Sequence, residues 1–263
     1  MNEFQTTQLL DSFNVLLIGD CCIDEYQIGT VDRLSPEAPV PVVNIQEIFS
    51  LPGMTSNVST NFKALGIDPD VITNDIETIV KTRIIDKRSG QHLIRVDKDQ
   101  NLTPWSGNTP FPLDHYHAVV ISDYNKGFLT YESIEHIVHS AKCPVFIDTK
   151  KKQVSRFSAK NSFIKINELE YKLIDQAPLN LIVTLGERGA MLKTQRIETV
   201  FATKAVEVMD VCGCGDTFLA ALTTQYLLTK NINEAIVFAN RASGLTVRHR
   251  GNYSPTYQEI INA

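Results

Sequence analysis

The chain has 263 residues, of which 43% are hydrophobic and 21% are charged, and its formal net charge is −5 at pH 7. This composition is typical of a globular protein and excludes a disordered or collagen-like chain. The acidic balance argues against a protein that coats nucleic acid or an anionic membrane. It is compatible with a local basic pocket for a phosphorylated small molecule.

The N-terminal segment and the cysteines predict a cytoplasmic protein. Residues 1–14 are polar and lack the apolar core of a secretory signal. No run of about 18 apolar residues predicts a membrane span. The chain has five cysteines, and this odd number is typical of reduced thiols rather than of a disulfide framework.

Short apolar runs alternate with helix-like stretches along the chain. The runs that predict buried parallel strands are residues 14–19, 118–122, 145–148, 162–166 and 181–184. Between them, stretches such as residues 130–141 place apolar side chains on one face of a helix. This alternation predicts an α/β fold with a mostly parallel central sheet, in which ligands bind beyond the carboxyl ends of the strands.

Three other segments, residues 39–45, 81–85 and 91–97, alternate apolar and polar residues as half-exposed strands do. They predict a small separate sheet, drawn approximately from residues 25–51 and 80–98, that projects over the strand-end pocket as a lid. An exposed face on this lid favours a homodimer. The chain shows no repeat and no Gly/Ser linker, so we expect one domain over residues 1–263.

The segment 210–222 carries the strongest chemical signal. Gly213 and Gly215 are followed by Asp216 and a small apolar run, which predicts a tight loop that opens into a helix. The free N–H groups at such a helix start bind phosphate, and the carboxylate suits a base that acts on an attacking hydroxyl. The alternative is a glycine-rich turn in which Asp216 only caps the helix. The spacing does not decide between the two.

Residues 210–218 are similar to the C-terminal signature of the ribokinase-like (PfkB) sugar kinases, which runs Asp-Thr-x-Gly-Ala-Gly-Asp-Thr/Ser-Phe. The resemblance extends over roughly residues 12–252 and is strongest to the D-glycero-β-D-manno-heptose-7-phosphate kinase branch. Its segments are residues 19–24, 33–42, 52–53 with 57–58, 91–97 and 122–127. The resemblance implies a three-layer ribokinase-like sandwich with a small β-sheet lid.

The resemblance implies a catalytic base, an anion hole and a nucleotide site. Asp216 takes the place of the base, and the N–H groups of Gly213, Cys214 and Gly215 take the place of the anion hole. The positions that match the family's nucleotide and Mg²⁺ segments are Lys150, Asn167, Glu170, Thr184, Gly186, Gly189 and Asn240. Asn167 and Glu170 match the Asn-x-x-Glu motif that organises Mg²⁺ through water, although the pair taken alone favours an Asn helix cap with a first-turn Glu.

The resemblance also implies an acceptor site. Asp24, Gly53 and Asn57 match positions that grip sugar hydroxyls. The cations expected near a 7-phosphate are Arg33, Arg95, Lys126 and Lys150, for each of which a solvated surface charge or an ordinary ion pair is the alternative.

Three departures distinguish this chain from the family pattern. Met54 stands where the second glycine of a Gly-Gly pair is usual, and Cys212 and Cys214 replace Thr and Ala in the anion-hole signature. Because a helix N-terminus lowers the pKa of a thiol, these two cysteines predict redox-sensitive activity, with small apolar filling as the alternative. After Asn74 the chain is shorter than the family by about one helix and one strand, an estimate from the resemblance.

Together these features predict a cytoplasmic kinase that uses ATP and Mg²⁺ to phosphorylate the C1 hydroxyl of a heptose 7-phosphate for nucleotide-activated heptose and lipopolysaccharide synthesis. The expected partners are the sugar phosphate, ATP and a second copy of the chain, with no nucleic acid and no membrane. No His-x-Gly-His motif of a fused nucleotidyltransferase is present, so only the kinase step is expected. The alternatives are another sugar or nucleoside kinase of the same family and a catalytically weak sugar-phosphate-binding protein.

Overall fold

The computed structural model describes residues 3–204 and 206–263 as two β-sheets with helices on both faces of the larger one. The larger sheet has eight strands in the order β12-β11-β10-β9-β8-β7-β1-β4. Its strands are β1 (Val15–Gly19), β4 (Asp70–Thr73), β7 (Ala118–Asp123), β8 (Val145–Thr149), β9 (Ser162–Asn167), β10 (Asn180–Thr184), β11 (Ala190–Thr194) and β12 (Glu198–Phe201). From β4 to β10 the strands are parallel, and β11 runs antiparallel to both of its neighbours, β10 and β12.

The apolar runs of the sequence form the centre of this sheet, because each run is buried on both faces. Every residue of β1, β7 and β8 is buried. The predicted α/β class and the mostly parallel sheet are therefore confirmed.

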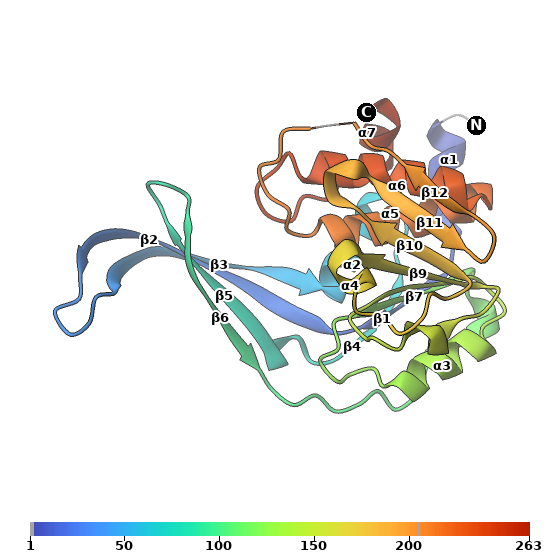
Figure 1. Ribbon diagram of the computed structural model, residues 1–263, viewed down its shortest axis with the longest axis horizontal. Coiled ribbons are helices and arrows are strands. Elements are labelled where there is room, and N and C mark those ends of the chain that lie inside the picture. Colours follow the sequence, from blue (N-terminus) through green and yellow to red (C-terminus); the bar gives the residue numbers. More distant parts are fainter. Residues whose placement is uncertain (1–2, 205) are drawn as a thin grey trace.

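The helices form two layers around the sheet (Figure 1). One apolar core contains residues of α2 (Thr55–Ala64), α5 (Cys214–Thr229) and α6 (Ile232–Thr246), with Leu10 of α1 (Glu3–Asp11) and Ile260 of α7 (Tyr257–Asn262). The other core contains residues of α3 (Tyr131–Ser140), whose buried side chains are Ile134, Ile137 and Val138. The short helix α4 (Glu168–Tyr171) follows β9 directly. The result is the predicted three-layer arrangement.

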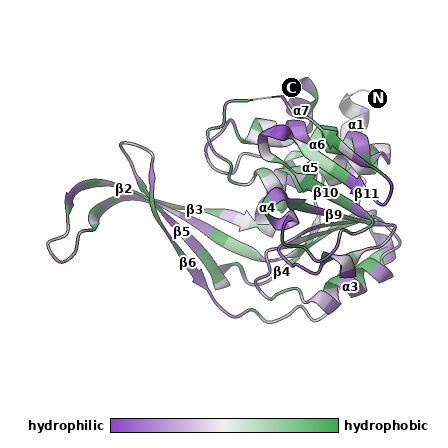
Figure 2. Cartoon of the chain, in the orientation of Figure 1, coloured by the Kyte–Doolittle hydropathy of each residue, from purple (hydrophilic) through white to green (hydrophobic). Residues whose placement is uncertain are grey.

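The smaller sheet is the predicted lid, and it extends away from the layered body in Figure 1. Its order is β3-β2-β5-β6, formed by β2 (Cys21–Leu34), β3 (Pro41–Met54), β5 (Ile79–Asp86) and β6 (His92–Asp99). The long strand β2 carries no alternating signal at its start, because both faces of its first residues are covered where it leaves the body. Figure 2 shows green, apolar stretches along these projecting strands.

The region after Asn74 is as short as the sequence indicates. A single 3₁₀ turn, Ile76–Thr78, separates β4 from β5. Strand β4 is therefore the edge strand of the large sheet, with β1 as its neighbour. Residues 101–112 form a loop.

Gly19, at the end of β1, packs closely against the neighbouring strand β7. A Cβ atom on Gly19 would lie 1.9 Å from the carbonyl oxygen of Ser122, whereas a Cβ on Gly244, inside α6, would meet nothing within 4 Å. We expect Gly19→Ala to destabilise the protein by about 2–4 kcal/mol because of overpacking. Gly244→Ala should stabilise it by about 0.5–1 kcal/mol through helix propensity. Urea unfolding measures both changes, and equal free energies of unfolding for the two variants would contradict this packing.

Candidate active site

The loop before α5 is shaped by Asp210 and Gly213. Oδ1 of Asp210 accepts a hydrogen bond from the N–H of Cys212 at 2.9 Å, and Oδ2 accepts one from the N–H of Gly251 at 3.0 Å. Gly213 has φ 72°, and a Cβ on it would lie 2.8 Å from Nδ2 of Asn57. Only glycine meets both conditions, so this turn delivers the first N–H groups of α5 to the carboxyl edge of the sheet.

Asp216 lies in the first turn of α5 and is only 5% exposed. Its Oδ2 accepts a hydrogen bond from Nδ2 of Asn57 at 2.8 Å, and its Oδ1 accepts one from the hydroxyl of Tyr124 at 2.8 Å. Burial raises the pKa of Asp216 to about 6, and these two hydrogen bonds oppose part of that rise. The carboxyl group is thus a partly protonated acid–base group near neutral pH, and not a simple helix cap.

Lys165 and Asp148 form a buried ion pair beneath this turn, and sequence analysis missed both. Nζ of Lys165 lies 2.6 Å from Oδ2 of Asp148 and donates to the carbonyl oxygen of Gly215 at 3.3 Å. Burial alone would lower the pKa of Lys165, but the charge and hydrogen bond of Asp148 outweigh it and raise the pKa. The sequence signal that could have revealed Lys165 is its position inside the apolar run 162–166.

A cavity of about 240 Å³ lies against the same turn. It brings together four of the seven residues predicted for the nucleotide, Thr184, Gly186, Gly189 and Asn240, with Cys214 and Gly215 of the predicted anion hole. Lys150, Asn167 and Glu170 are not among its described lining residues. Its remaining lining is largely apolar, with Val208, Val211, Phe218 and Val247. A slot with an apolar wall that ends at a helix N-terminus can hold a flat base at one end and phosphates at the other.

The Asn-x-x-Glu pair sits at the carboxyl end of β9. Oδ1 of Asn167 accepts a hydrogen bond from the N–H of Glu170 at 2.9 Å, and Oε2 of Glu170 accepts one from the N–H of Asn167 at 2.8 Å. This is a capping box on α4. The other oxygen of Glu170 pairs with the ammonium group of Lys150. The helix-cap interpretation is therefore geometrically correct, and the side chains also present a carboxylate and an amide at the strand end.

The acceptor residues lie where the lid meets the body. Asp24, 8% exposed, pairs with Arg83 on the neighbouring lid strand, with Nη1 of Arg83 2.6 Å from Oδ1 of Asp24. A Cβ on Gly53 would lie 2.3 Å from Oδ2 of Asp24, so only glycine fits beside this carboxylate. Met54 is 3% exposed and has φ 56°, a conformation that costs a non-glycine residue energy.

The structure does not gather all the predicted cations. Arg33 lies nine positions after Asp24 on the same strand, which is roughly 30 Å at about 3.3 Å per residue. Within one chain Arg33 therefore lies too far from Asp24 to contribute to this site, because the extended strand separates the two residues. The prediction for Arg33 is wrong in this respect. Arg95 pairs with Asp97, and Lys126 pairs with Asp99. Arg95 lies opposite Arg83 in the sheet, so Arg95 is on the face that bears Asp24.

The pKa values of the Cys212 and Cys214 thiols shift in the direction opposite to the prediction. Burial, followed by the charge of Asp210, raises the pKa of Cys212 to about 11, and burial also raises the pKa of Cys214. The expected lowering at the helix N-terminus is wrong because desolvation and nearby carboxylates outweigh the helix dipole. The predicted redox sensitivity loses its physical basis.

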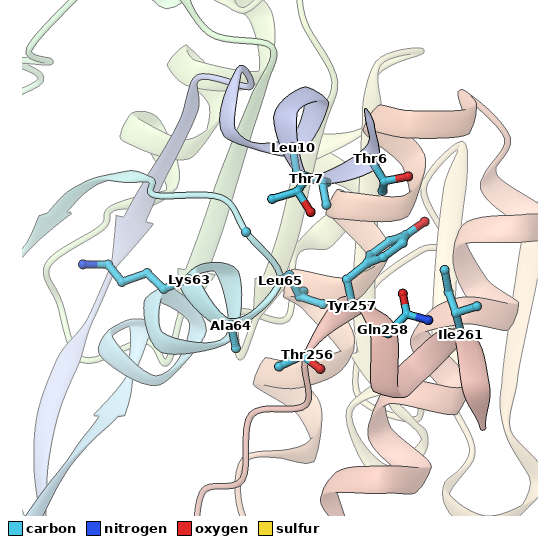
Figure 3. Close-up of a pocket in the computed structure, with 11 residues that line it drawn as sticks. Thr6, Thr7, Leu10, Lys63, Ala64, Leu65, Thr256, Tyr257, Gln258 and Ile261 are labelled. Carbon is cyan, nitrogen blue, oxygen red and sulfur yellow. The ribbon is translucent and has the colours of Figure 1, made fainter. Parts of the chain in front are cut away.

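A second hollow, of about 440 Å³, lies between α1, α2 and α7 (Figure 3). Among the described residues its only charged lining side chain is Lys63, which pairs with Asp68 at 3.2 Å. It has no carboxylate in its described lining, so it does not compete with the site at Asp216.

Comparison with known proteins gives the class. Residues 55–259 match the family model described as pfkB family carbohydrate kinase. The fold resembles the ribokinase of Thermotoga maritima, with a TM-score of 0.71, 17% identity and 95% and 98% of the two chains covered. It also resembles a nucleoside kinase of Methanocaldococcus jannaschii, with a TM-score of 0.72, 16% identity and 96% and 98% covered. The chain belongs to the pfkB family of carbohydrate kinases, phosphotransferases that act on an alcohol group.

Curated relatives refine this similarity. The chain is 34% identical to the bifunctional protein HldE of a Nitratiruptor species, over 94% of this chain and 64% of that protein. It is 31% identical to the bifunctional protein HldE of Aliarcobacter butzleri, over 94% of this chain and 63% of that protein. The chain thus spans just under two thirds of the length of these relatives. None of the helices in the described part of the chain has the length and apolar character needed to cross a bilayer.

The buried pair Lys165–Asp148 yields a stability prediction. Lys165→Met leaves the carboxylate of Asp148 buried without its cation, and we expect a loss of about 3–5 kcal/mol in the free energy of unfolding. The double variant Lys165→Met/Asp148→Leu removes both charges and should recover part of that loss. Urea unfolding of both variants tests this, and a double variant no more stable than Lys165→Met would argue against the ion pair.

Proposed function

We propose that this protein transfers the γ-phosphoryl group of ATP to the C1 hydroxyl of a heptose 7-phosphate. The product is the 1,7-bisphosphate used to make nucleotide-activated heptose for lipopolysaccharide. The observation that carries the proposal is the buried carboxylate of Asp216 at a helix start, beside a cavity lined by Thr184, Gly186, Gly189 and Asn240 of the expected nucleotide site. The similarity to HldE proteins and the segment 33–42 support the heptose acceptor.

In this proposal Asp216 takes the proton of the acceptor hydroxyl while that oxygen attacks the γ-phosphorus. The N–H groups of Gly213, Cys214 and Gly215 face the charge that develops on the transferred group. Lys165 adds a fixed positive charge beneath the same turn, since its ammonium contacts the carbonyl oxygen of Gly215. Asp24 and Asn57 hold acceptor hydroxyls at the border of lid and body.

Asn167 and Glu170 offer the donors that a hydrated Mg²⁺ prefers, which are uncharged and carboxylate oxygens. Their oxygens already accept hydrogen bonds within the capping box, so these residues would hold the ion through water. Within the described residues no three His, Cys, Asp or Glu side chains are close enough to bind a metal directly. When bound, the ion would neutralise charge on the phosphate oxygens of ATP. Lys150 lies beside Glu170 and adds a second cation there.

Arg83 is the best placed cation for the distal phosphate of the acceptor, and the sequence did not single it out. It is held against Asp24, and Lys81 precedes it by two positions, so both side chains emerge on one face of β5. Arg95 and Lys126, like Arg83, are paired with carboxylates, but their side chains are more exposed, at 58% and 26% against 11% for Arg83.

A different acceptor within the same family is the second candidate. Its specific support is Met54, which fills the position beside the acceptor site in a backbone conformation suited to glycine. Met54 forms a small buried cluster with Cys22 and Ile79, and Tyr124 packs against this cluster. Because Met54 is larger than the usual glycine, the substrate in this second proposal is a smaller sugar or a nucleoside.

We also propose that two copies of the chain pair through their lids in the cytoplasm. Ile48, Ile94 and Val96 are half exposed or more, at 60%, 55% and 50%. Their positions on β3 and β6 alternate with those of the residues that face the site, so they lie on the outer face of the lid.

Replacing Asp216 tests the proposed base. Asp216→Asn should lower kcat by about 10²–10⁴-fold with little change in ATP binding, because only proton removal is lost. Since the base acts in its ionised form and its pKa is about 6, wild-type kcat should fall as the pH drops below about 6. Coupled ADP release over heptose 7-phosphates, fructose phosphates, ribose and nucleosides measures both rate and acceptor. Asp114→Asn, at an exposed carboxylate, is the matched control.

Near-wild-type turnover in Asp216→Asn would remove Asp216 from the reaction. Turnover of a nucleoside or ribose in preference to heptose 7-phosphate would favour the second candidate.

The lid surface yields a separate prediction. Ile94→Lys places a charge in the proposed contact and should convert a dimer to a monomer, whereas Ile197→Lys, at an exposed position on the turn between β11 and β12, should not. Light scattering after size-exclusion chromatography measures the mass. A monomeric wild-type protein at micromolar concentration would refute the lid dimer.

A further inference from the structure

The hydroxyl of Tyr124 contacts the carboxylate of Asp216 and has no part in the reaction as proposed above. It donates to Oδ1 at 2.8 Å, while Nδ2 of Asn57 donates to Oδ2 at 2.8 Å. The two donors come from different segments, the loop after β7 and helix α2. A carboxylate held at both oxygens in this way cannot rotate about its Cβ–Cγ bond without breaking a hydrogen bond.

The loop that carries Tyr124 is itself fixed. Oδ2 of Asp20, a fully buried carboxylate, accepts the N–H of Tyr124 at 2.7 Å and the N–H of Lys126 at 3.2 Å. Asn125 between them has φ 57°, which turns the chain sharply at this point. The backbone on both sides of the turn is therefore tied to one carboxylate at the end of β1.

The ring of Tyr124 is flanked by two cations. Nζ of Lys81, from the lid, lies 5.3 Å from the ring centroid, and Nζ of Lys150, from the strand end of β8, lies 5.5 Å from it. Both distances are in the range of cation–π contacts. The ring is thus held by its own backbone and by ammonium groups from two other elements, and its hydroxyl is left to face Asp216.

Several groups around Asp216 set the balance between its ionised and protonated forms, so a donor at Oδ1 shifts that balance. Asp148 on β8 and the burial of the site disfavour the ionised carboxylate, whereas Lys165 on β9, Asn57 and Tyr124 favour it. Tyr124 in turn faces Cys22 on β2 in addition to the two lysines. Of the uncharged side chains, only the hydroxyl of Tyr124 and the amide of Asn57 donate to Asp216 among the described residues.

We propose that Tyr124 is a positioning residue that acts through Asp216, orienting the carboxylate toward the acceptor hydroxyl and keeping it ionised. This inference rests on the proposed function. In the reaction the acceptor proton moves to Asp216 as the acceptor oxygen bonds to the γ-phosphorus, and the bond from that phosphorus to ADP breaks. Tyr124 keeps its proton throughout and continues to donate to the carboxyl group.

The variant Tyr124→Phe removes the hydroxyl and keeps the ring between the two lysines. We expect kcat to fall by about 10–100-fold with KM for ATP changed by less than about two-fold, because orientation is lost and nucleotide binding is not. The acidic limb of the kcat–pH profile should move to higher pH, since the ionised carboxylate has lost a donor.

Tyr116→Phe is the matched control. Tyr116 also donates to a carboxylate, Oδ2 of Asp70 at 3.0 Å, but at the edge of the large sheet. Its kcat–pH profile should coincide with that of the wild type. Thermal unfolding of both variants shows that each is folded.

A second readout needs no sugar acceptor. Carbon-13 NMR follows the titration of aspartate carboxyls, and the signal of Asp216 is assigned by its absence in Asp216→Asn. In Tyr124→Phe the midpoint of this signal should rise by about 0.5–1 pH unit. A risen midpoint in a protein that phosphorylates no sugar supports the Tyr124 contact and rejects the proposed function. An unmoved midpoint together with an unmoved acidic limb overturns the positioning role, whatever the change in kcat.

Discussion

The carboxylate of Asp216 has to be kept charged in a place where water hardly reaches it. Burial disfavours the ionised form, and the structure offsets this cost with two donors and a cation from three other elements. Helix α5 supplies the carboxylate, α2 supplies Asn57, the loop after β7 supplies Tyr124, and β9 supplies Lys165. These elements meet because the parallel strands all end at one edge of the sheet. The rest of the fold holds these four elements together around Asp216.

The other charges of the site follow the same rule that a buried ion has a partner. Lys165 pairs with Asp148 and Arg83 pairs with Asp24, and the partly exposed Lys150 pairs with Glu170. A sugar phosphate or nucleotide bound as proposed would therefore meet cations that already have counter-charges, and its binding would exchange one set of ion pairs for another. Exchanging ion pairs costs less free energy than leaving unpaired charges in a cleft without water, and it favours ligands that carry several anionic oxygens.

The sequence predicted those parts of the fold whose signals are local. The central strands β1, β7, β8, β9 and β10 each coincide with an apolar run, and the loop into α5 was located by the spacing of Gly213 and Gly215. The start of β2 before residue 25 was not predicted, because Cys21 and Cys22 are both buried and the next buried position is the polar Asp24, so no apolar–polar alternation marks the strand. Tyr124 and Lys165 escaped because their roles come from contacts with residues 92 and 17 positions away. The pKa of the Cys212 and Cys214 thiols was predicted in the wrong direction, since burial acts on a thiol more strongly than the helix dipole does here.

Two of the lid's connections to the body are very short. Strand β2 starts after a single residue, Asp20, beyond the end of β1, and α2 begins at Thr55 directly after β3 ends at Met54. The two connections are side by side, since Cys21 pairs with Met54 in the sheet. Asn57 lies two positions after Thr55, so a shift at this junction would reach the helix turn whose amide is bonded to Asp216.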